Sequence, residues 1–568
     1  MDPETCRKQV LSEEYWDFII SESGGRARLP LPPEEPCYQK AGDGFEIVYL
    51  EKSLVNPISY QKYVYNSIPK CYALEDMDAM NQAGISQVQY YPSLKLMGEG
   101  VMIGFVDTGI DYTLDVFRNL DGTTRIAGIW DQTIQTGELP EGLGYGSAYT
   151  EEQINEALRS ENPLEIVPTQ DIEGHGTYLA SVACGSGNVE NRFLGAAPET
   201  TIAMVKMKPA KEYIRDFYGI SHDTKCYQEN DIMLGIRYLK NVADSYGMPL
   251  VLCVALGTNF GGHTGSSALA IMLQVTANSC NKIVVTGTGN EANQRHHYQG
   301  QLNGTDERNE VEVQIGEGVN AFSMEMWTEI PNLMAVSVIS PSGEVLPQIS
   351  VRQGSTFSFR FVFERTEVYI DNQIVTRFST SQLIFIRFRD PVPGIWKIVV
   401  EPLRLGDGRF HVWLPIKEFM TGEVIFLASS PETTLTEPSS SDSLITVSHY
   451  NGAENSIDIN SGRGYTRTGD VKPDFAAPGV DVTGVLPGGR YIRRTGSSAA
   501  AAITSGAGAL LIEWLLMQNS RFTGFNTMQL KGLFILGAVQ RPDIDYPNRE
   551  WGYGTLNLYG TLQAIREL

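Results

Sequence analysis

The sequence predicts an α/β fold built on a doubly wound parallel sheet, preceded by a small α+β unit and interrupted by an inserted antiparallel β domain. Continuous apolar segments such as VMIGFVD (101–107) are typical of strands that are buried on both faces of a parallel sheet. Segments with helical periodicity alternate with these strands along the chain. Between residues 306 and 429 this alternation stops, and short strand-like segments follow one another.

The N-terminal unit is predicted to cover residues 1–77. Residues 1–40 are polar and end in LPLPPEEP, which indicates a loop or linker, and FEIVYL (45–50) is expected to form a strand. The N-terminus lacks a basic segment followed by an apolar core and a small-residue cleavage site. We therefore expect no secretory signal peptide and synthesis in the cytoplasm.

The α/β domain is predicted to cover residues 78–305 and 430–568. Alternating strands and helices favour a parallel sheet with helices on both faces. The expected buried strands and helices are 101–107, 201–207, 230–247, 249–256, 266–280, 282–289, 444–450 and 497–518.

The inserted domain, residues 306–429, reads as an antiparallel β-sandwich or jelly roll. Its segments VEVQI, TFSFRFVF and LIFIRF have strand-like composition, with turn residues between them. Its apolar residues are explained by a sandwich core, so we expect it to brace the α/β domain. A carbohydrate- or protein-binding module is the alternative.

Composition excludes several classes of partner and site. The net charge of −23 disfavours nucleic acid, which attracts Lys and Arg. No stretch of about 18 uncharged apolar residues predicts a membrane span. The seven cysteines contain no CxxC pair, which argues against a zinc site and a disulfide scaffold. Cys184 and Cys253 lie in apolar segments and are expected to be core residues.

Three short segments carry residues typical of nucleophilic catalysis. GFVDTGID places Asp107 at the end of a strand, EGHGTYLASVACG places His175 at the start of a helix, and TGSSAAAAITSGAGAL places Ser498 at the start of another. A serine hydroxyl needs a base within hydrogen-bond reach, and an aspartate can orient that base. These residues are therefore candidates for nucleophile, general base and orienting acid.

A fourth segment, VVTGTGNEA, places Asn290 in a glycine-flanked turn after a strand. A side-chain amide there could donate to the oxyanion of a tetrahedral intermediate. Each of the four residues also has an ordinary structural interpretation, as a turn or capping residue. Their joint occurrence in this order favours catalysis.

VDTGID, GHGT, TGNE, GSSAA and DFAAPGVDV resemble the signature segments of subtilisin-like serine proteases. The resemblance implies that Asp107, His175 and Ser498 form a catalytic triad and that Asn290 is the oxyanion donor. Ser497 replaces the usual Thr and Ala502 the usual Pro, but aligning Gly496 with the family glycine selects Ser498 over Ser497. The substrate-binding residues implied by the resemblance are Ala255, Leu256, Gly257, Gly287, Thr288 and Gly289.

The inserted β domain narrows the resemblance to the Csp proteases of clostridial spore germination. It implies that residues 1–77 are a prodomain, which acts as an intramolecular chaperone, is cut off by the enzyme itself and can stay bound as an inhibitor. IPKCYALEDMD (68–78) would run through the substrate cleft, with cleavage near Met77–Asp78. The implied substrate is a protein, the precursor of a spore cortex-lytic enzyme, and the implied location is the spore.

Some members of that family are regulatory pseudoproteases, and this alternative stays open from the sequence alone. No cofactor is required by the expected chemistry. Calcium is common among subtilisin-like proteases, but no segment has EF-hand spacing, so no ligands are assigned. The histidine-containing segment QRHHYQG (294–300) is expected to be a surface loop rather than a metal site.

Overall fold

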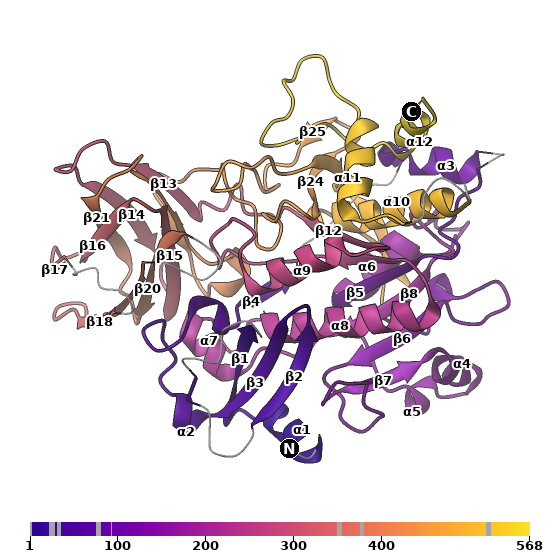
Figure 1. Cartoon of the computed structure of the whole chain (residues 1–568), viewed down its shortest axis with the longest axis horizontal. Coiled ribbons are helices and arrows are strands. Elements are labelled where there is room, and N and C mark those ends of the chain that lie inside the picture. Colours follow the sequence, from indigo (N-terminus) through magenta and orange to yellow (C-terminus); the bar gives the residue numbers. More distant parts are fainter. Residues whose placement is uncertain are drawn as a thin grey trace.

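The structure is a computed structural model, and it describes residues 3–21, 29–30, 36–74, 81–91, 94–348, 355–374, 380–517 and 524–567. Within these residues, a nine-stranded sheet has the order β25-β24-β12-β10-β5-β8-β6-β7, with β26 against β24 (Figure 1). Its inner strands are parallel, whereas β7 and β25 pair antiparallel at the edges. The strands are β5 (Met102–Asp107), β6 (Ile126–Asp131), β7 (Ser147–Thr150), β8 (Thr201–Lys206), β10 (Leu250–Val254), β12 (Lys282–Gly287), β24 (Ile445–Asn451), β25 (Ser456–Ile457) and β26 (Phe475–Pro478).

Helices cover both faces of this sheet because its strands are apolar on both sides. In β5, Ile103 and Phe105 belong to the core that includes α6 and α10, whereas Met102 and Val106 belong to the core that includes α8 and α9. This division follows from the alternation of side chains along a strand. The predicted α/β fold with a doubly wound parallel sheet is confirmed. The four helices are α6 (His175–Cys184), α8 (Glu229–Tyr246), α9 (Ala268–Asn278) and α10 (Ser497–Met517).

The helix α10 has the length and hydropathy of a membrane span, but 89% of its most apolar window is buried inside the protein. That burial is typical of a core helix. A hairpin of β27 and β28 packs against α6, where Tyr178 donates to the Val482 carbonyl at 2.8 Å. The remaining elements of this domain are η3 (Asn81–Ala83), α3 (Ile85–Tyr90), η4 (Asp115–Phe117), α4 (Glu151–Arg159), α5 (Pro163–Ile166), α7 (Glu212–Tyr218), β9 (Tyr227–Gln228), β11 (Leu256–Gly257), β27 (Val482–Leu486), β28 (Arg490–Arg494), α11 (Thr527–Leu536) and α12 (Leu558–Glu567).

The N-terminal unit contains an antiparallel sheet of order β1-β3-β2, which lies beside α8 (Figure 1). Ile19 and Ile47 share a core with α8, whereas Phe18 and Val48 on the other face belong to a second, aromatic core. No helix or strand was expected within the polar residues 1–40, but α1 and β1 form there and pack apolar residues such as Val10 and Phe18. Most of the expected loop LPLPPEEP lies outside the described residues. The elements are α1 (Pro3–Leu11), β1 (Tyr15–Ser21), β2 (Cys37–Gly42), β3 (Phe45–Glu51), α2 (Lys52–Val55), η2 (Tyr65–Ser67) and β4 (Cys71–Leu74).

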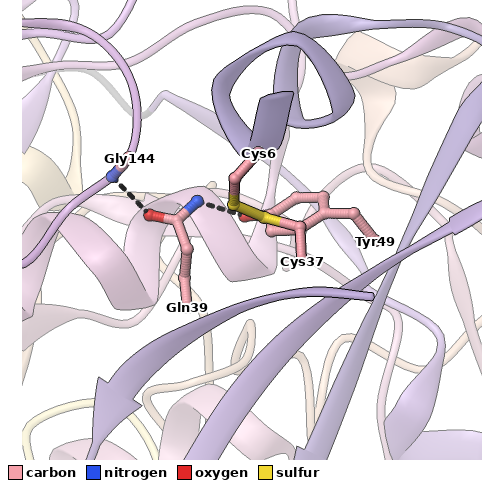
Figure 2. Close-up of a disulfide and its surroundings, with 5 residues drawn as sticks. All are labelled: Cys6, Cys37, Gln39, Tyr49 and Gly144. Carbon is pink, nitrogen blue, oxygen red and sulfur yellow. Dashed lines mark hydrogen bonds between the residues drawn. A yellow bond between two sulfur atoms is a disulfide. The ribbon is translucent and has the colours of Figure 1, made fainter. Parts of the chain in front are cut away.

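A disulfide joins Cys6 of α1 to Cys37 of β2, a pairing that the sequence analysis did not anticipate (Figure 2). Beside it, Gln39 donates to the Tyr49 hydroxyl and accepts from the Gly144 N–H, both at 2.8 Å. Gly144 belongs to the α/β domain, so Gln39 links the two units directly.

The inserted domain consists of two antiparallel sheets, of order β13-β22-β15-β20-β19-β18 and β17-β16-β21-β14-β23, that share one core. It projects to one side of the α/β domain (Figure 1). The segment 294–300 is not a surface loop, because His296 and His297 are buried. His296 Nδ1 lies 2.6 Å from Glu291 Oε2, and His297 Nε2 lies 3.0 Å from His411 Nδ1. The elements are β13 (His297–Gln301), β14 (Asn309–Ile315), β15 (Ala321–Glu329), β16 (Leu333–Ile339), β17 (Val345–Leu346), β18 (Ser355–Arg360), β19 (Glu367–Gln373), β20 (Ser381–Arg389), β21 (Gly394–Arg404), β22 (Arg409–Trp413), η5 (Lys417–Phe419) and β23 (Val424–Phe426).

Candidate active site

Asp107 and His175 form a hydrogen-bonded pair at the carboxyl end of the central sheet. Asp107 is the last residue of β5, and His175 is the first residue of α6. His175 Nδ1 lies 2.9 Å from Asp107 Oδ1 and 3.0 Å from Oδ2. Both side chains are buried, at 1% and 5% exposure, so water competes weakly for this bond. The arrangement orients the imidazole ring.

Asp171 holds the start of α6 in place, although the sequence analysis did not single it out. Its carboxylate accepts from the N–H groups of Gly174 at 2.8 Å and Thr177 at 2.9 Å, and from the Thr177 hydroxyl at 2.6 Å. Burial raises the pKa of Asp171, and these hydrogen bonds oppose that rise. Asp171 therefore satisfies donors at the N-terminus of α6 that no helical carbonyl can reach.

Thr108 fixes the other member of the pair. Its N–H donates to Asp107 Oδ1 at 2.7 Å, and its hydroxyl accepts from the Gly176 N–H at 2.9 Å. A Cβ at Gly176 would collide with the Gly109 carbonyl. The glycine in GHGT is therefore required by the close approach of α6 to the loop after β5.

The two serines that begin α10 have different surroundings. Ser497 Oγ accepts from the Gly289 N–H at 3.1 Å, so its hydroxyl is held against the chain after β12. Ser498 Oγ is buried and has no hydrogen-bond partner among the residues that the structure describes. Since α10 packs against α6, the first turn of α10 lies on the same side of the sheet as His175.

Asn290 lies next to this turn. Its Oδ1 accepts from the Ser497 N–H at 3.1 Å, which fixes the orientation of the amide. The Nδ2 end, a donor, then lies on the opposite side of the carboxamide. Gly289 precedes it with φ of +85°, a conformation that glycine adopts without strain.

The predicted substrate-binding residues lie in two segments. Leu256 and Gly257 form β11, and Ala255 precedes them, buried. Gly287 ends β12 and leaves no room for a side chain beside Ser497. Thr288 donates to the Val447 carbonyl and accepts from the Thr436 N–H, both at 3.0 Å.

The strand β4 of the N-terminal unit lies between β9 and β11, antiparallel to both. Leu74 pairs with Leu256 and Ala73 with Gly257, while Cys71 pairs with Gln228. The segment therefore occupies the groove between these strands as an added strand. Met77 and Asp78, the predicted cleavage residues, lie outside the described residues.

No group of three or more His, Cys, Asp or Glu side chains among the described residues could hold a metal ion. No calcium ligands are therefore assigned in the described part of the chain.

The chain matches a known protein family, a solved structure and several curated proteins. The subtilase family model matches residues 98–364 and 422–554. The structure of the Clostridium perfringens CspB protease superposes with a TM-score of 0.75 at 31% sequence identity, over 86% of this chain and 99% of that one. The Arabidopsis thaliana subtilisin-like protease SBT3.6 is 30% identical over 131 residues, which are 19% of this chain and 16% of the relative. The subtilisin-like protease SBT2.1 of the same plant is 33% identical over 125 residues, which span 15% of its length.

Proposed function

Because the chain belongs to the subtilase family, we propose that it is a serine endopeptidase with Asp107, His175 and Ser498 as its catalytic triad. The observation that carries the proposal is the buried Asp107–His175 pair, which lies on the same side of the sheet as the first turn of α10. His175 Nε2 takes the proton of the Ser498 hydroxyl and later delivers it to the leaving amine, while Asp107 stabilises the imidazolium. Asn290 Nδ2 donates to the oxyanion.

The first substrate of this site is the chain's own N-terminal segment. β4 binds between β9 and β11 as an extended peptide would, and the chain continues from Leu74 toward the segment with the proposed Met77–Asp78 bond. Residues 1–77 act as a prodomain that stays bound after cleavage. Ala255, Leu256 and Gly257 line one side of the cleft, with Gly287, Thr288 and Gly289 near its floor.

Beyond itself, the enzyme activates a protein by limited proteolysis. The resemblance to the Csp proteases supports a spore cortex-lytic enzyme precursor as that protein. Incubation with the precursor, followed by N-terminal sequencing of the product, tests this substrate. An uncut precursor together with full self-processing would show that the substrate is a different protein.

Self-processing is tested by comparing the wild-type chain with Ser498→Ala and Ser497→Ala on a denaturing gel. The wild type and Ser497→Ala should give two bands, one of them the size of residues 1–77, because Ser497 Oγ is used by Gly289. Ser498→Ala should give a single full-length band. A fluorophosphonate probe should label the wild type and not Ser498→Ala. Absence of labelling even after removal of the prodomain would instead support a regulatory pseudoprotease.

A further inference from the structure

Two buried thiols lie on one face of the small sheet that holds the N-terminal segment in the cleft. Cys71 begins β4, and Cys226 directly precedes β9. Cys71 pairs with Gln228, so it shares a face of the small sheet with Gln228 and with the residue two positions earlier, Cys226. Both cysteines have 0% exposure and lie in the same core, and each thiol shifts the pKa of the other.

The backbone fixes both residues of this pair. The Lys70 carbonyl accepts from the Glu229 N–H at 2.8 Å, which extends the ladder between β4 and β9 by one bond. The Cys226 carbonyl also has a backbone partner, because it accepts from the Ala210 N–H at 2.9 Å. Both cysteines therefore lie on segments that are anchored by backbone hydrogen bonds.

The Cys71 and Cys226 thiols differ in acidity, and this difference favours thiol–disulfide exchange. The neighbouring Cys71 thiol and the charge of Arg215 lower the pKa of Cys226, and burial raises the pKa of Cys71. A thiolate is the attacking species in thiol–disulfide exchange. Cys226 is thus suited to attack first and Cys71 to complete the reaction.

We propose that Cys71 and Cys226 form a disulfide that ties the N-terminal unit to the α/β domain, with a small-molecule disulfide as oxidant. The Cys226 thiolate attacks the oxidant, forming a mixed disulfide and releasing one thiolate. Cys71 then loses its proton and attacks the Cys226 sulfur, which releases the second thiolate. Two protein thiols are oxidised, and one small disulfide is reduced to two thiols. Because docked β4 covers both sulfur atoms, the exchange takes place before β4 docks or while it is transiently displaced.

The effect of this disulfide rests on the proposed self-cleavage, because the two cysteines lie on opposite sides of the proposed cleavage site. The proposed cut lies after Leu74 and before Cys226, so the disulfide would be a covalent link between the two products. The Cys6–Cys37 disulfide lies wholly within the N-terminal product and cannot serve this purpose (Figure 2). A tethered inhibitor has an effective concentration on the order of millimolar, so it would return to the cleft after each release.

The test uses the full-length protein with Cys280→Ser, which removes the exposed thiol, Cys280. The protein is incubated with oxidised glutathione, alkylated and run on a denaturing gel with and without reductant. The wild-type background should run as one full-length species without reductant and as two fragments with it. Cys226→Ser and Cys71→Ser should give two fragments in both lanes. Cys253→Ser, which removes another buried thiol, should behave as the background does.

Mass spectrometry of Ser498→Ala in the same background separates this proposal from the proposed function. A linked peptide containing Cys71 and Cys226 should appear after oxidation even though this variant is not cleaved. Its absence, with both cysteines alkylated, overturns the disulfide. A linked peptide in a wild type that shows no cleavage supports the disulfide and contradicts self-processing. Activity on a chromogenic peptide should rise by at least about tenfold when reductant is added to the oxidised background, and not in Cys226→Ser.

Discussion

At the scale of single residues, the proposed oxyanion donor Asn290 is held in one orientation by its neighbour Ser497. Its Oδ1 is held by the Ser497 N–H, so the amide cannot rotate without losing that bond. An oriented donor stabilises the developing oxyanion without reorganisation during the reaction. Ser497 thus contributes to the site through its backbone, while its hydroxyl bonds to Gly289.

Asn290→Ala should lower kcat with little change in KM, because the donated bond forms in the transition state. In subtilisin the equivalent loss is about 100- to 1000-fold in kcat, and we expect a similar effect here. Steady-state kinetics on a chromogenic peptide measures it. Asn278→Ala, at an exposed position on α9, is the control and should stay within about twofold of the wild type. Equal losses in both variants would contradict the role of Asn290.

Asp171→Asn should disturb His175 without removing any group of the triad. The asparagine keeps one acceptor oxygen, so the bond to either Gly174 or Thr177 is lost at the start of α6. A lost buried hydrogen bond costs about 1–3 kcal/mol, and we expect kcat to fall by about tenfold with KM unchanged. Asp223→Asn, at an exposed position, is the control. An unchanged kcat in Asp171→Asn would show that α6 is positioned without this carboxylate.

The candidate site could be predicted in part because its motifs are local. Gly176 and Gly289 meet steric requirements that appear in the sequence as GHGT and GTGN. The roles of Asp171 and Thr108 depend on hydrogen bonds that form only when α6 docks beside β5. The position of Asp171, four residues before His175, was the available signal.

At the scale of elements, the inserted domain holds the N-terminal unit in place. Gln373 of β19 donates to the Tyr60 carbonyl at 2.9 Å, and the Tyr65 hydroxyl donates to Glu325 of β15 at 2.8 Å. The Phe385 ring packs edge-on against Tyr60, with centroids 4.9 Å apart. Since these contacts do not involve the proposed cleavage segment, they would survive self-cleavage.

Gln373→Ala should therefore speed the loss of the N-terminal unit from the cleaved protein. The hydrogen bond to the Tyr60 carbonyl is buried, so its removal costs about 1 kcal/mol, or roughly a fivefold faster dissociation. Size-exclusion chromatography of the cleaved protein under reducing conditions, sampled over time, measures the release. Gln301→Ala, an exposed residue of β13, should release the unit at the wild-type rate. The same rate in both variants would mean that β19 does not hold the unit.

The elements that the sequence predicted best are the continuous apolar strands, such as β5 and β12, because burial on both faces leaves an unambiguous pattern. α1 and β1 were missed because α1 carries charged residues and the apolar part of β1 is short. The burial of His296 and His297 was missed in part because His411, the partner of His297, is distant in the sequence and only the fold brings it near. The Cys6–Cys37 pairing likewise depends on the docking of α1 beside β2.

At the scale of the whole molecule, a stack of aromatic and imidazole rings joins the inserted domain to the α/β domain. Trp413 of β22 stacks on His263 of the α/β domain at 3.9 Å between ring centroids, and on His297 at 4.7 Å. His297 Nε2 lies 3.0 Å from His411 Nδ1, so one ring donates and the other accepts. The junction of the two domains is thus built from neutral histidines.

This junction should make the protein sensitive to acid. Burial lowers the pKa of His263 to about 4 and of His297 to about 3, and it lowers the pKa of His411 well below its usual range. In the unfolded chain each histidine titrates near pH 6.5. As the pH falls below about 6.5, the unfolded state binds protons that the folded state does not, so the free energy of unfolding decreases. The stabilisation is complete above pH 6.5 and is lost progressively as the pH falls, down to about pH 4 for His263 and about pH 3 for His297.

We expect each histidine to remove roughly 2 kcal/mol of stability between pH 6.5 and pH 5. Urea unfolding at several pH values measures how the free energy of unfolding changes with pH. The Ser498→Ala variant is used because it avoids self-cleavage. Replacing both His297 and His411 by Gln should lower the number of protons bound on unfolding by two. The free energy of unfolding should then change less steeply with pH. Buried carboxylates such as Glu325 and Glu437 have a raised pKa and act in the opposite direction, so the histidine contribution comes from the difference between the two proteins. Equal slopes would show that acid acts elsewhere, whereas a shallower slope would identify the domain junction as the acid-labile part of the molecule.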